Sequence, residues 1–141
     1  MKTRSLGREL AFKYLYSLDV AGKDETTDFL EFSIDQESSA EARLFAEQLV
    51  RGTLKAKPEL ITAIEETAKN WPWRRMPVVD RNVILAGACE LMSANDIPAS
   101  VTINEFVDLA KKYGSNASGS FVNGILDALK KRLAPAKNAK E

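Results

Sequence analysis

Three stretches in the last part of the chain decide its fold class. Residues 78–92 read VVDRNVILAGACELM, residues 102–115 read TINEFVDLAKKYGS and residues 118–129 read SGSFVNGILDAL. In each stretch apolar side chains recur every three or four residues, which is the period of an α-helix with a buried face. The first stretch is apolar nearly all round, so we expect it to be the central helix. No stretch alternates like a strand, so the sequence predicts an all-α protein.

Start and stop signals place the ends of these helices. The first begins near Pro77, because proline suits an opening turn. Thr102 and Glu105 have the spacing of a capping box, which predicts that the second helix opens there. Gly114 predicts the end of that helix in a left-handed conformation, and Ser118 is the expected cap of the last helix.

The first half of the chain is less regular. Apolar spacing predicts helices over residues 6–18 and 58–71, and a capping box of Ser38 and Glu41 predicts a helix over residues 38–56 with Leu44 on its buried face. Residues 23–37 are acidic and lack a period, so we interpret them as a loop with at most one short helical turn.

The segment WPWRRMP at residues 71–77 is a proline-bounded linker that suggests two three-helix subdomains packed together. The predicted N-terminal unit, with a basic first turn, spans residues 1–70, the C-terminal unit spans residues 71–134, and residues 135–141 form a disordered tail. We expect the first helix to lean against the C-terminal unit. Trp71 should pack between the units, and Trp73 with its neighbouring arginines should form a secondary contact surface.

Composition argues against an enzyme. The chain has no histidine and one cysteine, Cys89, so it lacks the commonest general base and cannot build a cysteine-rich zinc site. No phosphate-binding glycine loop is present, and we expect no catalytic residue, no metal and no cofactor. Without a long apolar run or a signal peptide, the sequence predicts a cytoplasmic protein that does not enter a membrane.

The formal net charge of zero hides an uneven distribution. Residues 1–20 carry four basic and two acidic side chains, and residues 111–141 carry seven and two. Lys2, Arg4 and Arg8 lie close together on the first helical turns, where they could contact successive phosphates of a nucleic acid. The alternative is a solvated basic turn without a ligand.

A second candidate anion site is the small, polar loop that joins the last two helices. Ser115, Asn116 and Ser118 lie at a helix N-terminus, whose free N–H groups favour phosphate. Phe121 follows directly and either stacks on an unpaired base or packs in the core. Asn123 and Gly124 have a structural explanation, in which Gly124 permits a close contact between helices.

The chain resembles the NusB family of bacterial transcription antitermination factors. The strongest matches are the motifs VDR at residues 79–81, EL at 90–91, DIP at 96–98, INE at 103–105, LAKKYGS at 109–115 and FVNGILD at 121–127. A weaker match at the start includes Arg4, Arg8 and Tyr16. The resemblance covers most of the chain and is poor between residues 21 and 42.

The resemblance implies a function and partners. The chain would bind boxA-type single-stranded RNA as a heterodimer with NusE, a ribosomal small-subunit protein, and tie the RNA to the RNA polymerase antitermination complex on ribosomal RNA operons. Arg4 and Arg8 match RNA-contacting arginines, and Tyr16 and Asp80 match positions that contact NusE. The opening turn and the loop before Phe121 should then meet in one RNA surface.

Departures from the family leave alternatives open. Ser5, Leu6 and Ser120 stand where basic residues are common, so the basic patch is thinner here. The chain could therefore be a protein-interaction module that has lost RNA binding. It could also be an RNA-binding accessory domain like that of ribosomal RNA cytosine methyltransferases. Some relatives form homodimers, and the sequence leaves this possibility open.

Overall fold

The computed structural model describes residues 2–24, 26, 28–69, 71–94 and 96–139, with side chains up to residue 132. Over these residues the chain is all-helical, which confirms the predicted fold class. The helices are α1 Lys2–Ala21, α2 Phe29–Gln36, α3 Ala40–Lys55, α4 Lys57–Thr67, the short 3-10 helix η1 Trp73–Arg75, α5 Val78–Ser93, α6 Ala99–Tyr113 and α7 Ser118–Ala139. None of the described helices combines the length and apolar character that crossing a membrane requires.

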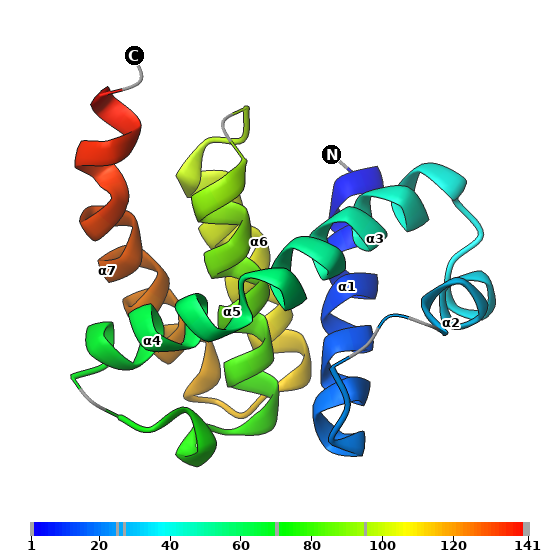
Figure 1. Ribbon diagram of the computed structural model, residues 1–141, viewed down its shortest axis with the longest axis horizontal. Helices are drawn as coiled ribbons and strands as arrows, with labels where there is room; N and C mark the ends of the chain where they lie inside the picture. The colour runs from blue at the N-terminus through cyan, green and yellow to red at the C-terminus, as the bar shows by residue number, and fades with distance from the viewer. Residues whose placement is uncertain (1, 25, 27, 70, 95, 140–141) are drawn as a thin grey trace.

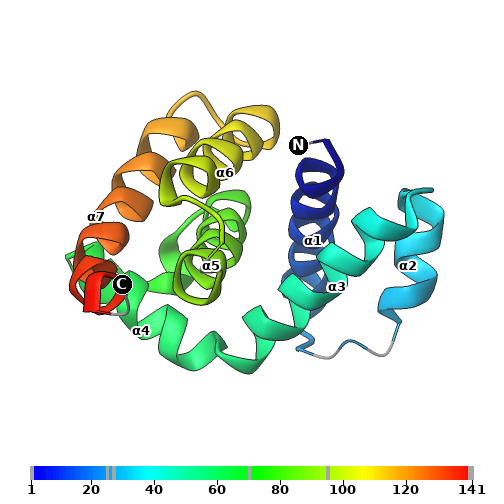
Figure 2. The ribbon, with the colours of Figure 1, turned by 90° about the horizontal axis from the view of Figure 1, so that it is seen from above.

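Helix α5 lies at the centre of the molecule (Figure 1). All residues from 82 to 91 are buried, as the nearly continuous apolar sequence predicts. Helices α6 and α7 pack on α5 from one side, while α1 packs on it from another. Seen from above, α3 and α4 form a curved band that runs from α1 to α7 (Figure 2).

The division into two units near residue 70 stays a prediction. Helix α4 packs mainly against α5 and α7, although it belongs to the first half of the chain. One cluster of buried apolar side chains includes members from both halves, among them Leu15, Val50, Ile84 and Phe106. Helix α1 does lean against α5 and α6, as expected.

The acidic segment contains a helix that the sequence reading treated as a loop. Helix α2 buries Phe29, whose ring meets Tyr14 of α1 edge-on at 5.0 Å between centroids. The Tyr14 hydroxyl donates a hydrogen bond to Asp28 at 2.6 Å. Leu30 and Ile34 point to solvent. Apolar residues therefore occur on both faces of α2, which hides the helical period.

The predicted start of α3 is off by one residue. Its N-cap is Ser39, whose hydroxyl accepts a hydrogen bond from the backbone N–H of Ala42, so Ser38 is not the cap. Leu44, predicted to face the core, is 56% exposed. The buried face of this helix instead includes Ala42 and Ala46, small residues that allow α1 to approach closely.

The predicted capping box of α6 is wrong. Pro98 is the N-cap, and α6 begins at Ala99, three residues earlier than expected. Thr102 and Glu105 lie inside the helix and face its neighbours, where the Thr102 hydroxyl donates to Glu90 of α5. The spacing that resembles a cap therefore serves contacts between helices.

Two glycines and the end of α7 also differ from expectation. Gly114 has extended φ and ψ of −99° and −162°, and it is needed because an added Cβ would lie 2.3 Å from the Ser118 hydroxyl. An added Cβ on Gly124 would meet open space, so this residue permits no close helix contact. Helix α7 continues past Pro135 to Ala139, where we predicted a disordered tail. Residues 140 and 141 lie outside the described residues.

A buried ion cluster joins α1 to α5 and α6. The Arg8 guanidinium donates from Nε and Nη2 to the two carboxylate oxygens of Glu90, at 2.8 and 3.1 Å. Its Nη1 donates to Glu105 at 2.9 Å. Arg8 and Glu90 are each 2% exposed at the side chain. Ser5 and Thr102 donate to the same two carboxylates, so the cluster is well supplied with hydrogen bonds.

Helix α3 covers the other side of this cluster. The Phe45 ring lies 5.4 Å from the Arg8 guanidinium carbon, within the range of a cation–π contact. Gly7 permits this approach, because an added Cβ would lie 2.7 Å from the Phe45 ring. Among the described residues, every buried side-chain nitrogen and oxygen has a hydrogen-bond partner. A fully satisfied cluster of this kind fixes the position of α1.

Substitution of Glu90 tests this cluster. Glu90→Gln keeps the side chain's shape but leaves the buried Arg8 charge without its main counter-ion. Breaking a buried pair in this way typically costs about 3–5 kcal/mol, and the remaining bond to Glu105 should place the loss near the lower value. Urea denaturation followed by circular dichroism measures the free energy of unfolding.

The matched control is Glu47→Gln. Glu47 pairs with Arg51 on the exposed side of α3, at 3.0 Å, and removal of such a pair should cost about 0–1 kcal/mol. Equal losses for the two variants would show that the buried pair does not hold α1 in place.

Candidate nucleic-acid interface

The structure separates the three predicted cations of the first turns. Lys2 is exposed. Arg4 is 46% exposed at the side chain, lies 5.9 Å from the Phe45 ring centroid and makes a contact of 3.3 Å with Asp96, which is itself exposed. Arg8, in contrast, is buried in the ion cluster. In this conformation Arg8 cannot reach a ligand at the surface, so the predicted basic patch reduces to Lys2 and Arg4.

The prediction that the opening turn and the loop of residues 114–117 meet in one compact site is wrong. Arg4 contacts Asp96, just before α6, whereas Ser118 follows that loop after α6 and binds Asp80 at the start of α5. Helix α6 has 15 residues and is therefore about 22 Å long. Figure 1 shows the N-terminus of α1 at the top and the loop between α6 and α7 at the bottom.

A groove between α1 and α6 connects the two ends. Its upper part is a hollow of about 330 Å³ whose lining includes Lys2, Ser5, Glu9 and Lys112. Lys112 donates to Glu9 at 2.7 Å and Tyr113 donates to the same carboxylate. Burial by itself raises the pKa of Glu9, but the hydrogen bonds from Lys112 and Tyr113 outweigh it and lower that pKa below its ordinary value. Conversely, Glu9 raises the pKa of Lys112, so both groups stay charged at neutral pH.

The lower part of the groove is apolar. Phe12, Lys13, Tyr16, Val79 and Tyr113 line a second hollow of about 330 Å³. Tyr16 is 38% exposed and contacts Phe12, with ring centroids 6.1 Å apart. An exposed aromatic beside an apolar hollow is typical of a protein-binding surface, because such residues anchor many interfaces. Tyr16 therefore lies where its predicted role requires.

Asp80 and Ser118 do not present their side chains to solvent. Asp80 is 4% and Ser118 1% exposed, and the Ser118 hydroxyl donates to Asp80 at 2.6 Å. The same hydroxyl accepts from the backbone N–H of Ser115 at 2.9 Å. These two residues shape the loop from beneath, while Ser115 and Asn116 form its exposed surface.

Phe121 packs against the core, one of its two predicted roles, and stacking on a base stays a prediction. Its ring is half-buried, packs against the core and also contacts Trp71 at 5.0 Å between centroids. The roles expected for the two tryptophans are reversed. Trp71, predicted to be packed, is 42% exposed, whereas Trp73 is buried beneath Arg81, 5.7 Å from the guanidinium carbon.

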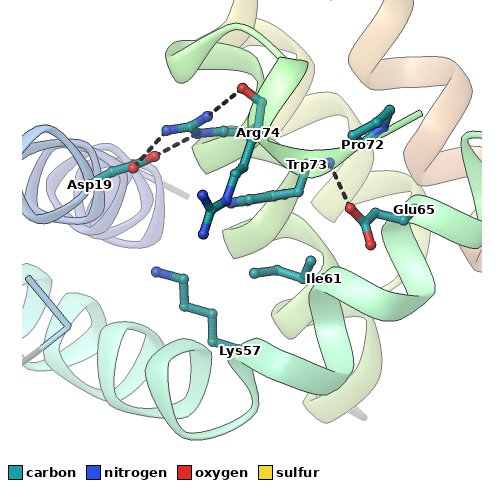
Figure 3. Close-up of a pocket in the computed structure, with 8 residues that line it drawn as sticks. Asp19, Lys57, Ile61, Glu65, Pro72, Trp73 and Arg74 are labelled. Carbon is teal, nitrogen blue, oxygen red and sulfur yellow. Dashed lines mark hydrogen bonds and ion pairs between the residues drawn. The ribbon is translucent and has the colours of Figure 1, made fainter. Parts of the chain in front are cut away.

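A further hollow of about 730 Å³ lies between the end of α1, α4 and the linker. Figure 3 shows the side chains of Lys57 and Arg74 extending into it from opposite walls. Asp19 accepts two hydrogen bonds of 2.7 Å from Arg81 and one of 2.8 Å from Asn82. Burial raises the pKa of Asp19, but these bonds overcome it and lower that pKa, so the carboxylate stays ionised and its charge is paired with Arg81.

Sequence reasoning missed the groove's own cations and aromatics. Lys13 lies on the same face of α1 as Glu9 and Tyr16, a spacing that was visible in the sequence. Lys112 and Tyr113 carried no such signal, because their position beside α1 depends on how α6 packs. Within the described ranges, no group of three or more metal-ligating side chains comes together.

Comparisons with known proteins agree with this architecture. A Geobacter sulfurreducens protein named transcription antitermination protein NusB is 44% identical over 135 residues, which cover 94% of this chain and 97% of the relative. A relative of the same name from Sorangium cellulosum is 38% identical, with 94% and 95% covered. These names describe transcription factors and not enzymes, in agreement with the expectation that the chain has no catalytic function.

Solved structures give the same result. T. maritima NusB superposes with a TM-score of 0.85 at 32% identity, covering 98% of this chain and 97% of that one. A crystal structure of antitermination factors NusB and NusE in complex with dsRNA gives a TM-score of 0.85 at 29% identity, covering 94% and 98%. Residues 5–131 match the statistical profile of the NusB family, and the chain therefore belongs to that family.

Proposed function

We propose that the chain is a transcription antitermination factor that binds boxA-type single-stranded RNA together with NusE. Bound in this way, it links the nascent transcript to the RNA polymerase antitermination complex and promotes processive transcription of ribosomal RNA operons. Such a role places the protein in the cytoplasm, where transcription takes place in bacteria. The role requires neither a cofactor nor catalysis.

The observation that carries the proposal is the structural likeness to NusB solved with NusE and RNA, over nearly the whole length of both chains. The surface features support the same conclusion. An exposed basic turn, a groove with ammonium groups and an exposed polar loop follow one another along α1 and α6. A single strand of RNA is long enough to follow this path, so these features need not meet in one compact site.

We assign the RNA contacts to the side chains that remain free to reach phosphates. Lys2 contacts the strand at the upper end of the groove, and Arg4 contacts it at the nearby hollow between α1 and α3. Ser115 and Asn116 contact it at the lower end, where the loop also offers backbone N–H groups at the start of α7. Phe121 supplies an aromatic face beside this loop. Arg8 and Ser118 have structural roles instead.

Affinity should depend on salt through these phosphate contacts. For single-stranded nucleic acid, each phosphate contact steepens the slope of log K against log salt concentration by about 0.7, where K is the association constant. Arg4→Gln should therefore weaken RNA binding in the presence of NusE and reduce that slope by about 0.7. Fluorescence anisotropy with a labelled boxA oligonucleotide at several salt concentrations measures both quantities.

Lys55→Gln is the matched control, because it removes one exposed cation from the end of α3, away from the groove. Its slope should equal that of the unchanged protein. Equal slopes for Arg4→Gln and the unchanged protein would remove Arg4 from the RNA surface. Absence of RNA binding even with NusE present would favour a protein-interaction module that has lost RNA binding.

The partner surface comprises Tyr16 with the apolar hollow beside it. We assign NusE to this surface, since Tyr16 and Val79 are accessible there and Lys13 provides a charged rim. Asp80 contributes by holding the neighbouring loop through Ser118, because its carboxylate is buried. Its role toward NusE is therefore indirect in this conformation.

Tyr16→Ala should weaken NusE binding about 5- to 30-fold, because tyrosines that become buried at interface centres often contribute about 1–2 kcal/mol. Isothermal titration calorimetry measures the dissociation constant without RNA. Ile34→Ala, which shortens an exposed apolar side chain on the distant α2, controls for loss of surface area. If both variants bind NusE like the unchanged protein, the partner lies elsewhere.

A further inference from the structure

We propose that Trp71 and Phe121 together form a stacking platform for one unpaired base of the bound RNA. This inference rests on the proposed function and adds Trp71, to which no RNA role has been assigned so far. It concerns the lower end of the RNA path, beside the loop of residues 114–117. Trp71 comes from the linker after α4, and Phe121 comes from the second turn of α7.

The two rings contact each other and are tilted, not coplanar. Their centroids are 5.0 Å apart and their planes are inclined by 55°. Phe121 is anchored because part of its ring packs against the core. Trp71 is 42% exposed, so part of its ring is accessible to a ligand.

The backbone around Trp71 holds its ring in place. Lys69 adopts a positive φ of 55°, which turns the chain sharply at the end of α4. The backbone N–H of Trp71 then donates to the backbone carbonyl of Ala68 at 3.2 Å. Pro72 restricts the backbone that follows. A preorganised ring loses little conformational freedom on binding, which favours its use as a platform.

The surroundings of the platform suit a nucleotide. Ser120 is exposed beside Phe121, and Gly124, one turn beyond Phe121, leaves open space in place of a side chain. Lys111 lies against Gly119, on the opposite side of α7 from Phe121, and does not border the rings. A flat base can approach the rings across the open space at Gly124.

The same surroundings distinguish this site from the protein-binding surface at Tyr16. That surface is a hollow lined mainly by apolar side chains, whereas the aromatic pair is bordered by the small residues Ser120 and Gly124. Base–aromatic stacking tolerates any base, because every base has a π-face. The proposed platform therefore adds affinity for unpaired RNA without selecting a sequence.

The first test replaces the aromatic ring. Trp71→Ala should weaken binding of a boxA oligonucleotide, in the presence of NusE, by about 5- to 150-fold, the fold-change expected from the stacking of one base. Trp71→Phe keeps a ring and should retain most of the affinity. Leu44→Ala, which shortens an exposed apolar side chain on α3, should leave affinity unchanged. Thermal unfolding and NusE affinity show whether each variant remains folded.

The second test does not depend on the stability of an alanine variant. The chain contains two tryptophans, so Trp73→Phe leaves Trp71 as the sole indole fluorophore. Titration with RNA should quench its emission, with a midpoint equal to the dissociation constant from anisotropy. The converse variant, Trp71→Phe, reports on buried Trp73 and should show no such change.

Two results would overturn the inference while leaving the proposed function intact. One is RNA binding by Trp71→Ala that equals that of the unchanged protein. The other is emission from Trp71 that stays constant at saturating RNA, or that responds to NusE without RNA, since the partner protein would then cover the ring. If the unchanged protein binds no RNA with NusE present, the proposed function fails, and this inference fails with it.

Discussion

The buried guanidinium of Arg8 is the constraint on which the arrangement of helices depends. It makes a bidentate pair of hydrogen bonds with Glu90 of α5 and donates a third hydrogen bond to Glu105 of α6. One side chain thus connects three helices. A charge at this depth is tolerated only because its partners are equally buried and their remaining oxygens are occupied. The cluster therefore specifies where α1 lies, and with it the groove between α1 and α6.

This use of Arg8 changes how a neutral protein with few free cations can bind RNA. Lys2, Arg4 and Lys111 remain accessible, but they lie at different ends of the molecule and do not form one patch. RNA binding along an extended path gains from several weak contacts, each sensitive to salt. NusE, bound beside the lower part of the groove, would supply further contacts to the same strand. Dependence on the partner is a natural consequence of the thin basic surface.

The sequence predicted those features that local patterns encode. The apolar run of residues 82–91 was enough to identify α5 as the central helix, and the period in α6 and α7 was enough to place their buried faces. Tertiary contacts account for the errors. Thr102 and Glu105 have the spacing of a cap, but they serve the ion cluster, and Pro98 begins the helix. Arg8 has the sequence neighbourhood of a surface cation, and only the packing of α5 shows that it is buried.

The candidate site was predictable to a similar degree. Tyr16 and Arg4, which the resemblance indicated, and Lys2, which the charge pattern indicated, are accessible, whereas Asp80 and Ser118 bind each other beneath the loop. No pattern in the chain indicated that Trp71 would be the exposed tryptophan and Trp73 the buried one. Both lie in a linker without a helical period, so their environments depend on the surrounding helices α4, α5 and α7.

The most direct measurement of the structural role of Arg8 is the salt dependence of RNA binding by the double variant Arg8→Met with Glu90→Met. Replacement of a buried ion pair by apolar side chains of similar size is often neutral for stability, so the fold should survive, as circular dichroism can verify. If Arg8 only positions α1, the folded double variant binds RNA with NusE at an unchanged slope of log K against log salt concentration. A slope reduced by about 0.7 in a folded double variant would show that Arg8 contacts a phosphate, and would contradict this account.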